Sequence, residues 1–200
     1  MGKDEKPIGV AVLGFGNVGS QVVRIIEESA QDLAARIGAP LVLRGIGVRR
    51  VADDRGVPID MLTDDIDELV SRDDVDIVVE LMGPVDPARK AIRSALEKGK
   101  SVVTANKALM AVSTGELAQA AGSAHVDLYF EAAVAGAIPV IRPLTQSLAG
   151  DTVSESRASS TGRRTTSSPR WTAPVPITAR LWPMRARWDT PRRNPPTTPS

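Results

Sequence analysis

The chain contains no cysteine and only one histidine, His125, among its 200 residues. Without thiols it has no disulfide, no thiolate metal site and no cysteine nucleophile, which suits a reducing compartment. A single histidine excludes paired-histidine metal sites, and His125 stands in a polar stretch that favours the surface. The chain also lacks a G-x-S-x-G motif and a P-loop, so the hydrolase and phosphate-cradle sites that those motifs mark are excluded.

Long apolar runs are absent as well. No stretch of the sequence approaches the about 18 apolar residues of a transmembrane helix. The opening residues, MGKDEKP, match neither a signal peptide nor a myristoylation signal. We therefore expect a soluble, cytoplasmic protein that has no membrane partner.

The composition of the chain changes after Val153, and no lysine stands beyond that point. Residues 1–153 carry 16 basic and 22 acidic side chains, whereas residues 154–200 carry nine arginines, eight prolines, two acidic residues and all three tryptophans. The acidic front argues against a nucleic-acid surface there. The tail has no periodic apolar positions, so we expect it to be disordered. Such a change of composition is typical of GC-rich codons translated in the wrong frame.

Back-translation of the tail supports a frameshift. With a suitable choice of synonymous codons, Ala158–Thr172 translates in the neighbouring frame as Ile-Val-Asn-Gly-Thr-Thr-Asn-Tyr-Ile-Leu-Ser-Glu-Met-Asp. Arginine and tryptophan are adjacent or close in the written tail, a pattern that suits stacking on nucleic acid. Wrong-frame translation already accounts for both residue types, so we predict a frameshift near Val153 and no nucleic-acid partner.

Apolar runs alternate with helical patterns through the front of the chain. We expect strands at Ile8–Leu13, Leu41–Val48, Val75–Leu81, Ser101–Thr104 and Val126–Phe130, and helices from about Val18 to Arg36 and at Ile66–Val70, Pro87–Lys98, Thr114–Gly122 and Ile138–Leu148. Continuously apolar strands are typical of sheets buried on both faces. The alternation with helices predicts an α/β fold with a doubly wound, Rossmann-type parallel sheet.

A glycine motif follows the first expected strand. Gly14-Phe15-Gly16-Asn17-Val18-Gly19 has the pattern G-x-G-x-x-G. Gly14 permits the tight turn, Gly16 lets a pyrophosphate approach the backbone, and Gly19 lets the helix pack closely on the strand. The N-terminus of that helix supplies N–H groups for the anion. The motif favours a dinucleotide site; the alternative is a glycine turn that only joins two elements.

The second expected strand is followed by Arg49 and Arg50, where an NAD site usually has an acidic residue for the ribose 2′-hydroxyl. A guanidinium at this position pairs with a 2′-phosphate instead. Asp53 and Asp54 come too late to be the acid at the strand end. We therefore predict NADP in preference to NAD, with solvated loop charges as the alternative.

Polar residues also follow two later strands. Thr104 and Lys107 stand after the fourth expected strand, at the edge where ligands bind in such sheets. A lysine there is placed to approach a nicotinamide and a substrate oxygen; the alternative is a surface lysine at a strand end. Met82 and Gly83 follow the third strand and are candidates to line the nicotinamide ribose, although an ordinary turn explains them nearly as well.

An acidic residue opens the apolar, glycine-containing segment Glu131–Pro139. One carboxylate together with several backbone carbonyls suits a hard cation, because no soft ligand is present. A tight structural loop is the alternative.

Four segments stand in an order that resembles homoserine dehydrogenase: GFGNVG, TANKALM, YFEAAVAGAIPVI and the out-of-frame NGTTNYIL. The resemblance covers about residues 7–153 in the written frame. It implies NAD(P)-linked interconversion of homoserine and aspartate semialdehyde, on the route to threonine and methionine. It also implies that Phe15, Asn17 and Val18 hold the cofactor with the glycines, and that Thr104 and Lys107 lie by the nicotinamide, where Lys107 positions or polarises the substrate.

The same resemblance implies a monovalent cation, often sodium, at Glu131, Val134, Gly136 and Ile138. It divides the chain into a cofactor-binding domain at 1–150, with the start of a central catalytic domain at about 131–150, and an out-of-frame tail at 154–200. The family's second lysine and the carboxylates for the substrate amine lie beyond the break. We therefore expect this chain to be inactive and not to form the native dimer of a homo-oligomeric parent. The alternative is a non-catalytic nucleotide-binding module.

Overall fold

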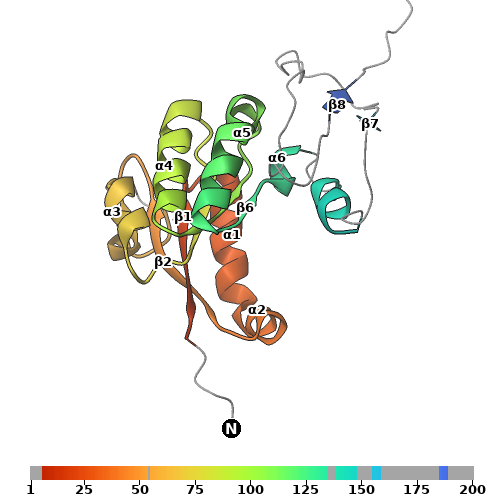
Figure 1. Ribbon diagram of the computed structural model, residues 1–200. Coiled ribbons are helices and arrows are strands. Elements are labelled where there is room, and N and C mark those ends of the chain that lie inside the picture. The colour runs from red at the N-terminus through yellow and green to blue at the C-terminus, as the bar shows by residue number, and fades with distance from the viewer. Residues whose placement is uncertain (1–5, 54, 135–137, 148–154, 159–184, 189–200) are drawn as a thin grey trace, which may run out of the picture.

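The computed structural model describes residues 6–53, 55–134, 138–147, 155–158 and 185–188 (Figure 1). The apolar runs of the front segment form one six-stranded sheet, in which every neighbouring pair of strands is parallel. The strand bounds are β1 Ile8–Leu13, β2 Leu41–Gly47, β3 Leu62–Thr63, β4 Ile77–Glu80, β5 Ser101–Thr104 and β6 Leu128–Tyr129. All five expected strands are present, each slightly shorter than or equal to its apolar run.

The strand order is β3-β2-β1-β4-β5-β6. The chain therefore builds outward from β1 to β2 and β3, returns to the middle, and builds the other half from β4 to β6. This is the order of a doubly wound nucleotide-binding sheet. The predicted α/β, Rossmann-type fold is confirmed.

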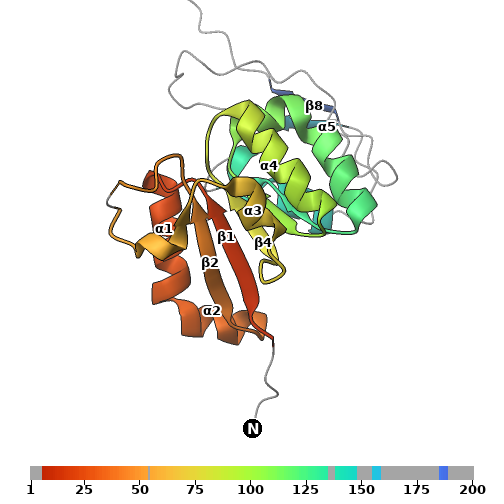
Figure 2. The same cartoon turned by 90° about the vertical axis from the view of Figure 1, so that its left-hand side faces the viewer.

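Helices cover both faces of the sheet (Figure 2). Their bounds are α1 Asn17–Glu28, α2 Ala30–Ile37, α3 Ile66–Ser71, α4 Val85–Glu97, α5 Lys107–Ala124 and α6 Glu131–Val134, with a short 3-10 turn, η1, at Ile59–Met61. The α5 helix ends at His125, which is exposed, as its polar surroundings in the sequence indicated.

Several elements differ from the expectation. The single helix expected up to Arg36 is interrupted at Ser29, which has a non-helical backbone and joins α1 to α2; serine favours helix ends over helix interiors. Helix α5 begins at Lys107 instead of Thr114, because the Asn106 side chain caps its first turn. Strand β3 has two residues, too few for a periodic pattern to predict.

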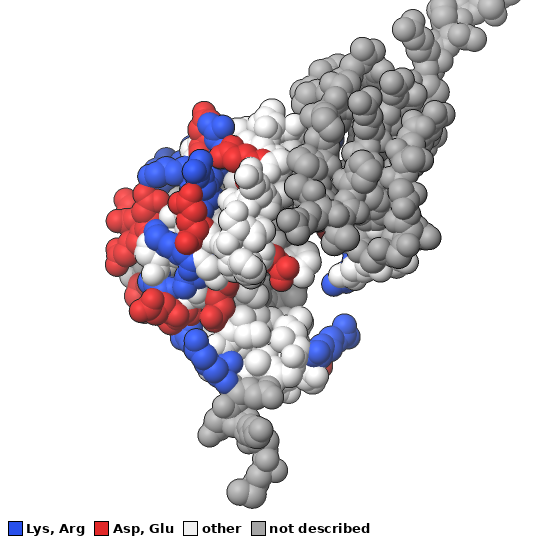
Figure 3. All heavy atoms as spheres, in the orientation of Figure 1, with Lys and Arg blue, Asp and Glu red and all other residues white. Residues whose placement is uncertain are grey.

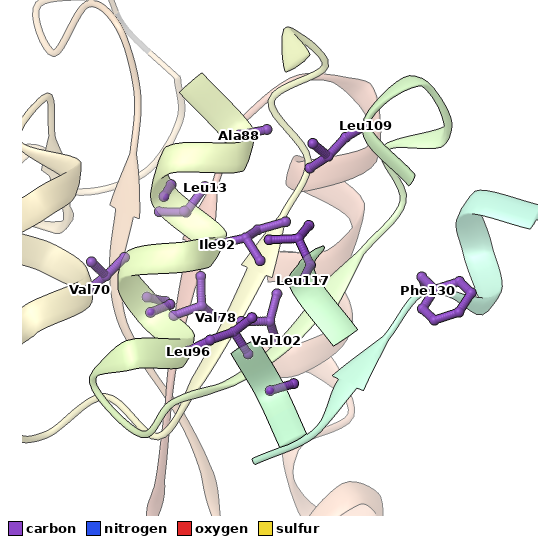
Figure 4. Packing of buried hydrophobic residues seen from close by; sticks show 14 of the residues in the cluster. Leu13, Val70, Val78, Ala88, Ile92, Leu96, Val102, Leu109, Leu117 and Phe130 are labelled. Atoms are coloured by element: carbon purple, nitrogen blue, oxygen red, sulfur yellow. The ribbon is translucent and has the colours of Figure 1, made fainter. Parts of the chain in front are cut away.

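The core has two layers, one on each side of the sheet. Along β1, Val10 and Val12 face the layer beneath α1, whereas Ala11 and Leu13 face the layer beneath α4 and α5. Figure 4 shows Ile92 and Leu96 of α4 between the strands and Leu117 of α5. This alternation explains why β1 is apolar throughout: both faces of the strand are buried.

The segment after β6 is only partly helical. Residues 141–147 are helical, with Pro143–Ser147 (η2) in a π-helix, so the expected helix from Ile138 starts later. The tail contributes two short strands, β7 Glu155–Ala158 and β8 Arg185–Trp188, which pair in parallel and which its composition did not predict. The rest of 154–200 lies outside the described residues, so disorder of the tail stays a prediction.

Charged side chains of both signs alternate on the surface over α3 and α4 (Figure 3). Lys90 pairs with Asp67 at 2.6 Å, and Arg93 pairs with Glu97 at 2.8 Å and with Glu116 at 3.2 Å. The Lys90–Asp67 pair links α4 to α3 and the Arg93–Glu116 pair links α4 to α5, whereas the Arg93–Glu97 pair lies within α4. In the part of the chain that is described, none of the helices has the length and apolarity needed to cross a membrane.

Candidate functional site

The carboxyl ends of β1 and β4 lie side by side at the point where the strand order reverses, with Leu13 paired to Glu80. In open α/β sheets, ligands bind in the crevice at this switch point. The loops that carry the candidate cofactor residues all leave this edge of the sheet: Gly14–Gly19 after β1, Arg49 and Arg50 after β2, Met82 and Gly83 after β4, and Thr104 to Lys107 after β5. The fold thus gathers residues that are far apart in the sequence.

Two glycines of the motif are fixed by close packing. Gly14 has a φ of +99°, and a Cβ on it would lie 2.6 Å from the carbonyl oxygen of Leu81. A Cβ on Gly19 would lie 2.0 Å from the carbonyl oxygen of Gly14. The strand-to-helix turn is therefore closed against both the helix that follows it and the loop after β4, and only glycine fits at either position.

The middle glycine has a different environment. A Cβ on Gly16 would meet no atom within 4 Å, so the space beside this residue is open. Gly16 is the N-cap of α1, no side chain caps that helix end, and no acidic residue stands in its first turn. Exposed Asn17 and Val18 begin the helix. An uncapped helix N-terminus beside open space is an arrangement that accepts an anion.

The arginines after β2 differ in their partners. The Nε of Arg50 donates to the Oδ2 of Asp53 at 3.1 Å; the Arg50 side chain is exposed, and that of Asp53 is partly buried. Arg49 is exposed and forms no hydrogen bond or ion pair with the residues that the structure describes. The Arg49 guanidinium is thus available to a ligand. Arg50 would have to leave Asp53 in order to pair with an anionic group of a ligand.

A further arginine, Arg55, lies against the glycine loop. Its two terminal nitrogens donate to the carbonyl of Phe15 at 3.4 Å and to Asp53 at 3.1 Å, and its Nε is buried without a partner among the described residues. The sequence pattern did not single out Arg55, because it stands in an irregular segment after β2. Its contact with the loop joins the glycine motif to the arginines after β2.

A buried carboxylate lies at the end of β4. Glu80 is 0% exposed, and among the described residues no basic side chain forms an ion pair with it. Its Oε1 accepts the backbone N–H of Met82 at 2.7 Å, and its Oε2 accepts the Thr104 hydroxyl at 2.6 Å. A buried charge without a counter-ion is costly unless such donors satisfy it. Glu80 therefore ties the loop after β4 to the end of β5.

The Thr104 side chain is used within the protein. Thr104 is 0% exposed; its hydroxyl donates to Glu80 and accepts the backbone N–H of Asn106 at 3.0 Å. A hydroxyl has a single proton to donate, and that proton is already committed. The sequence predicts that Thr104 lies beside a cofactor. In the structure its side chain bonds to Glu80 and to the backbone of Asn106, and so helps to hold the loop between β5 and α5.

Asn106 joins the same two loops from the other side. Its side-chain nitrogen donates to the carbonyl of Gly83 at 3.2 Å, while its Oδ1 accepts the N–H of Leu109 at 3.1 Å and so caps α5. The side chain is nearly buried. Glu80 and Asn106 belong to the two strand-end segments that the sequence predicted to lie at the cofactor, but neither was singled out as a site residue, although a carboxylate that ends the apolar run VDIVVE was a signal of an unusual position.

Lys107 is the first residue of α5 and is exposed. The structure describes no hydrogen bond or ion pair of its ammonium group with any described residue. A cation at a helix N-terminus opposes the helix dipole, at a cost of about 0.3–1 kcal/mol. Residues that break such a local rule concentrate at functional sites. The ammonium group is free to meet an oxygen atom of a ligand at the crevice edge.

The Glu131 carboxylate accepts backbone N–H groups at the start of the helical segment 141–147. Its Oε1 accepts the N–H groups of Val140 and Ile141, the latter at 2.9 Å, and its Oε2 accepts the N–H of Arg142 at 2.7 Å. Burial by itself would raise the pKa of Glu131, but these three donors outweigh it and hold the pKa below its ordinary value. The carboxylate is therefore held in its charged form by the backbone.

This use of Glu131 bears on the predicted cation. A carboxylate has about four lone-pair sites, and three of them are taken up by N–H donors. Val134 and Ile138 are described near it in the chain, whereas Gly136 lies outside the described residues. Among the residues described, no group of three or more acidic or histidine side chains is arranged so that it could hold a metal ion. Glu131 keeps about one lone-pair site beyond these three donors, and the cation site, which includes Gly136, stays a prediction.

The Glu131 cap has a consequence for acid stability. A lowered folded-state pKa contributes stability above the unfolded pKa, and that stability is lost as the pH falls through the folded value. We expect Glu131→Gln to lower the melting temperature at neutral pH, and the difference from the unmutated chain to shrink once the pH is below about 4. Asp127→Asn, a change at an exposed carboxylate just before β6, is the control. A difference that persists unchanged in acid contradicts this role.

Comparison with known proteins adds an independent line of support. A family model described as homoserine dehydrogenase, NAD binding domain, matches residues 14–131. The homoserine dehydrogenase of Mycobacterium tuberculosis (strain H37Rv) is 85% identical over 150 residues, which cover 75% of this chain and 34% of that protein. The chain thus spans about a third of the length of the curated relatives it matches.

Solved structures agree with the sequence relatives. A homoserine dehydrogenase from Thiobacillus denitrificans superposes with a TM-score of 0.68 at 36% identity, over 74% of this chain and 35% of that chain. A hyperthermophilic archaeal homoserine dehydrogenase in complex with NADPH superposes with a TM-score of 0.57 at 26% identity, over 69% of this chain and 48% of that chain.

Proposed function

Since the chain belongs to the homoserine dehydrogenase family, through its NAD-binding domain, we propose that its front segment holds NADP for the interconversion of homoserine and aspartate semialdehyde. The observation that carries this proposal is the glycine loop at the switch point. Gly14 and Gly19 are closed against neighbouring backbone, whereas Gly16 borders open space next to an uncapped helix N-terminus. A pyrophosphate fits that combination, because it needs both close backbone approach and free N–H groups.

The proposed cofactor residues are the members of the glycine loop together with the strand-end residues Arg49, Arg50, Met82, Gly83, Thr104 and Lys107. Titration of the chain with NADPH, followed by calorimetry, tests this directly. Saturable one-to-one binding supports the proposal, and heat changes no larger than those of dilution contradict it.

The preference for NADP over NAD is proposed from the arginines after β2. Arg49 has no partner among the described residues and Arg50 pairs only with Asp53, so both can turn toward a 2′-phosphate. The archaeal relative in complex with NADPH is in keeping with this preference. Arg55, held against Phe15, would support the same side of the crevice.

We expect NADPH to bind more tightly than NADH, and the double variant Arg49→Ala/Arg50→Ala to reduce that difference by about tenfold, since hydrogen bonds to a charged group contribute about 1.5–3 kcal/mol. Calorimetric titration of both nucleotides measures the difference. Arg89→Ala/Arg93→Ala removes the same charge from the outside of α4 and should leave the ratio unchanged. Equal affinities for the two nucleotides in the unmutated chain contradict the preference.

A nicotinamide cofactor held by these residues would supply the hydride chemistry at the carbon that carries the homoserine hydroxyl. Oxidation also removes the hydroxyl proton, so a proton acceptor must stand within hydrogen-bond reach of that oxygen. The Lys107 ammonium is the group of this chain that we assign to the substrate oxygen, where a positive charge stabilises the charge that develops on it. By the resemblance, the proton acceptor and the carboxylates for the substrate amine belong to the sequence beyond the break near Val153.

The residues after Val153 are accordingly proposed to be translated out of frame, and the chain as written to be inactive. A monovalent cation at Glu131, Val134, Gly136 and Ile138 stays a prediction from the resemblance, and no step of the reaction is derived from it. A cytoplasmic location, a place in threonine and methionine biosynthesis and a homo-oligomeric parent are proposed on the same grounds.

A further inference from the structure

A continuous chain of hydrogen bonds joins the loop after β4 to the start of α5. The N–H of Asn106 donates to Thr104, the Thr104 hydroxyl donates to Glu80, and the other carboxylate oxygen of Glu80 accepts the N–H of Met82. Asn106 closes the circuit by donating from its side chain to the carbonyl of Gly83. We refer to Glu80, Thr104 and Asn106 as the strand-end network.

The strand-end network has a fixed polarity. The Thr104 hydroxyl accepts the N–H of Asn106 and donates its own proton to Glu80, and an acceptor at the position of Glu80 satisfies that proton. A carboxylate accepts from both sides, whereas an amide presents a donor on one of them. The bonds from Thr104 and from Met82 thus both end on the carboxylate of Glu80, which is the acceptor at the centre of the network.

The fold has no evident need for a charge here. The next residue of β4 on the same side, Val78, is fully buried in the apolar layer beneath α4, and Leu13 on β1 pairs directly with Glu80. An apolar side chain at this position would suit the surrounding core and avoid the cost of desolvating a carboxylate. A carboxylate in such apolar surroundings indicates that the ligand site at the crevice edge, and not the core, calls for a polar residue here.

The two loops that the network joins lie on one half of the crevice. In a doubly wound sheet, one mononucleotide lies over the β1–β2 half and the other over the half built from β4. The arginines after β2 mark the adenosine side, so Met82, Gly83 and the start of α5 mark the nicotinamide side. Lys107 directly follows Asn106 and is the first residue of α5. The network therefore also determines the position of the residue that carries the ammonium group.

We propose that Glu80 is a positioning residue for the nicotinamide end of the cofactor, acting through Met82, Thr104 and Asn106. This inference rests on the proposed function. Glu80 touches neither ligand nor substrate in this role. It holds the loop after β4 and the first turn of α5 at a fixed separation, so that the nicotinamide is received between them.

The test compares two ligands on the 200-residue chain. NADPH carries the nicotinamide, and 2′-phospho-ADP-ribose is the same molecule without it. In Glu80→Gln, which keeps the volume but reverses one hydrogen bond, we expect the Kd for NADPH to rise about tenfold, because hydrogen bonds to a charged group are the strong ones. The Kd for 2′-phospho-ADP-ribose should stay within about twofold, since its binding depends on the glycine loop and the arginines. Calorimetry measures both.

A second pair of variants tests the network if Glu80→Gln does not fold. Thr104→Val removes the hydroxyl and should repeat the loss for NADPH alone, and Thr104→Ser restores the hydroxyl and should recover the affinity. Asp76→Asn is the matched control: its carboxylate also accepts a backbone N–H, that of Gly9 at 2.7 Å, but just before β4, at the opposite edge of the sheet.

The outcomes separate the inference from the function beneath it. Unchanged NADPH affinity in Glu80→Gln and Thr104→Val overturns the inference, as does an equal loss for both ligands, which would mean that the network only supports the fold. If the unmutated chain binds neither ligand, the proposed function fails and the inference fails with it.

Discussion

We expect the chain as written to be inactive, and we expect homoserine dehydrogenase activity once the reading frame is restored after Val153 and the chain is extended through the recovered Asn-Gly-Thr-Thr-Asn-Tyr segment to the end of its domain. As written, the chain holds candidates for the cofactor and for one substrate contact, and it lacks the proton acceptor that the resemblance puts downstream. Hydride transfer needs both in one geometry. Formation of NADPH from homoserine and NADP measures the gain.

Within the repaired enzyme, Lys107→Ala should reduce kcat by about 100-fold or more, because it removes the charge assigned to the oxygen of the substrate. The matched control is Lys98→Ala, which removes a lysine before β5, at the opposite edge of the sheet from Lys107. The control should keep nearly full activity. Homoserine oxidation by the chain as written would contradict the frameshift proposal, and full activity of the repaired Lys107→Ala enzyme would remove that lysine from the site.

Two alanine substitutions in the glycine loop should affect different properties: Gly16→Ala the affinity for NADPH, and Gly19→Ala the stability of the fold. Gly16→Ala adds a methyl group to open space, so the melting temperature should hardly change, yet the methyl group takes the place that a pyrophosphate would use. We expect its Kd for NADPH to rise at least tenfold, a loss of about 1.4 kcal/mol or more in binding free energy.

Gly19→Ala should lower the free energy of unfolding instead. Its Cβ would lie 2.0 Å from the carbonyl oxygen of Gly14, which is backbone and cannot rotate away. Such overpacking costs about 1–3 kcal/mol, and at this distance we expect the upper end of that range. Thermal unfolding and NADPH titration of the two variants, made side by side, separate the roles. Loss of stability in Gly16→Ala, or none in Gly19→Ala, contradicts this division of the motif.

Much of the fold could be predicted because its signals are local. Apolar runs such as Ile8–Leu13 are strands because both of their faces are buried, and that requirement is written in consecutive residues. The glycine motif is equally local, since a tight strand-to-helix turn limits which side chains fit. The change of composition after Val153 is visible in residue counts alone.

The family resemblance was also accessible from sequence, and the relatives confirm it over the front of the chain. The boundaries of single elements were less accessible. Helix α5 begins at Lys107 because the Asn106 side chain reaches the N–H of Leu109. The capping residue was visible in the sequence, but the apolar pattern used to locate helices starts later.

What only the tertiary structure decided concerns contacts between distant residues. Glu80 and Thr104 meet across neighbouring strands, and Arg55 reaches back to Phe15 from an irregular segment. The Glu131 carboxylate, which resembles a cation ligand in the sequence, is engaged by three backbone N–H groups that come after an intervening loop. The sequence by itself determined the alternation of the main strands and helices and the glycine turn after β1, because those depend on neighbours along the chain. The partners of the buried polar groups were decided by the fold, because the cost of desolvation favours positions where such a group meets a donor or acceptor in space.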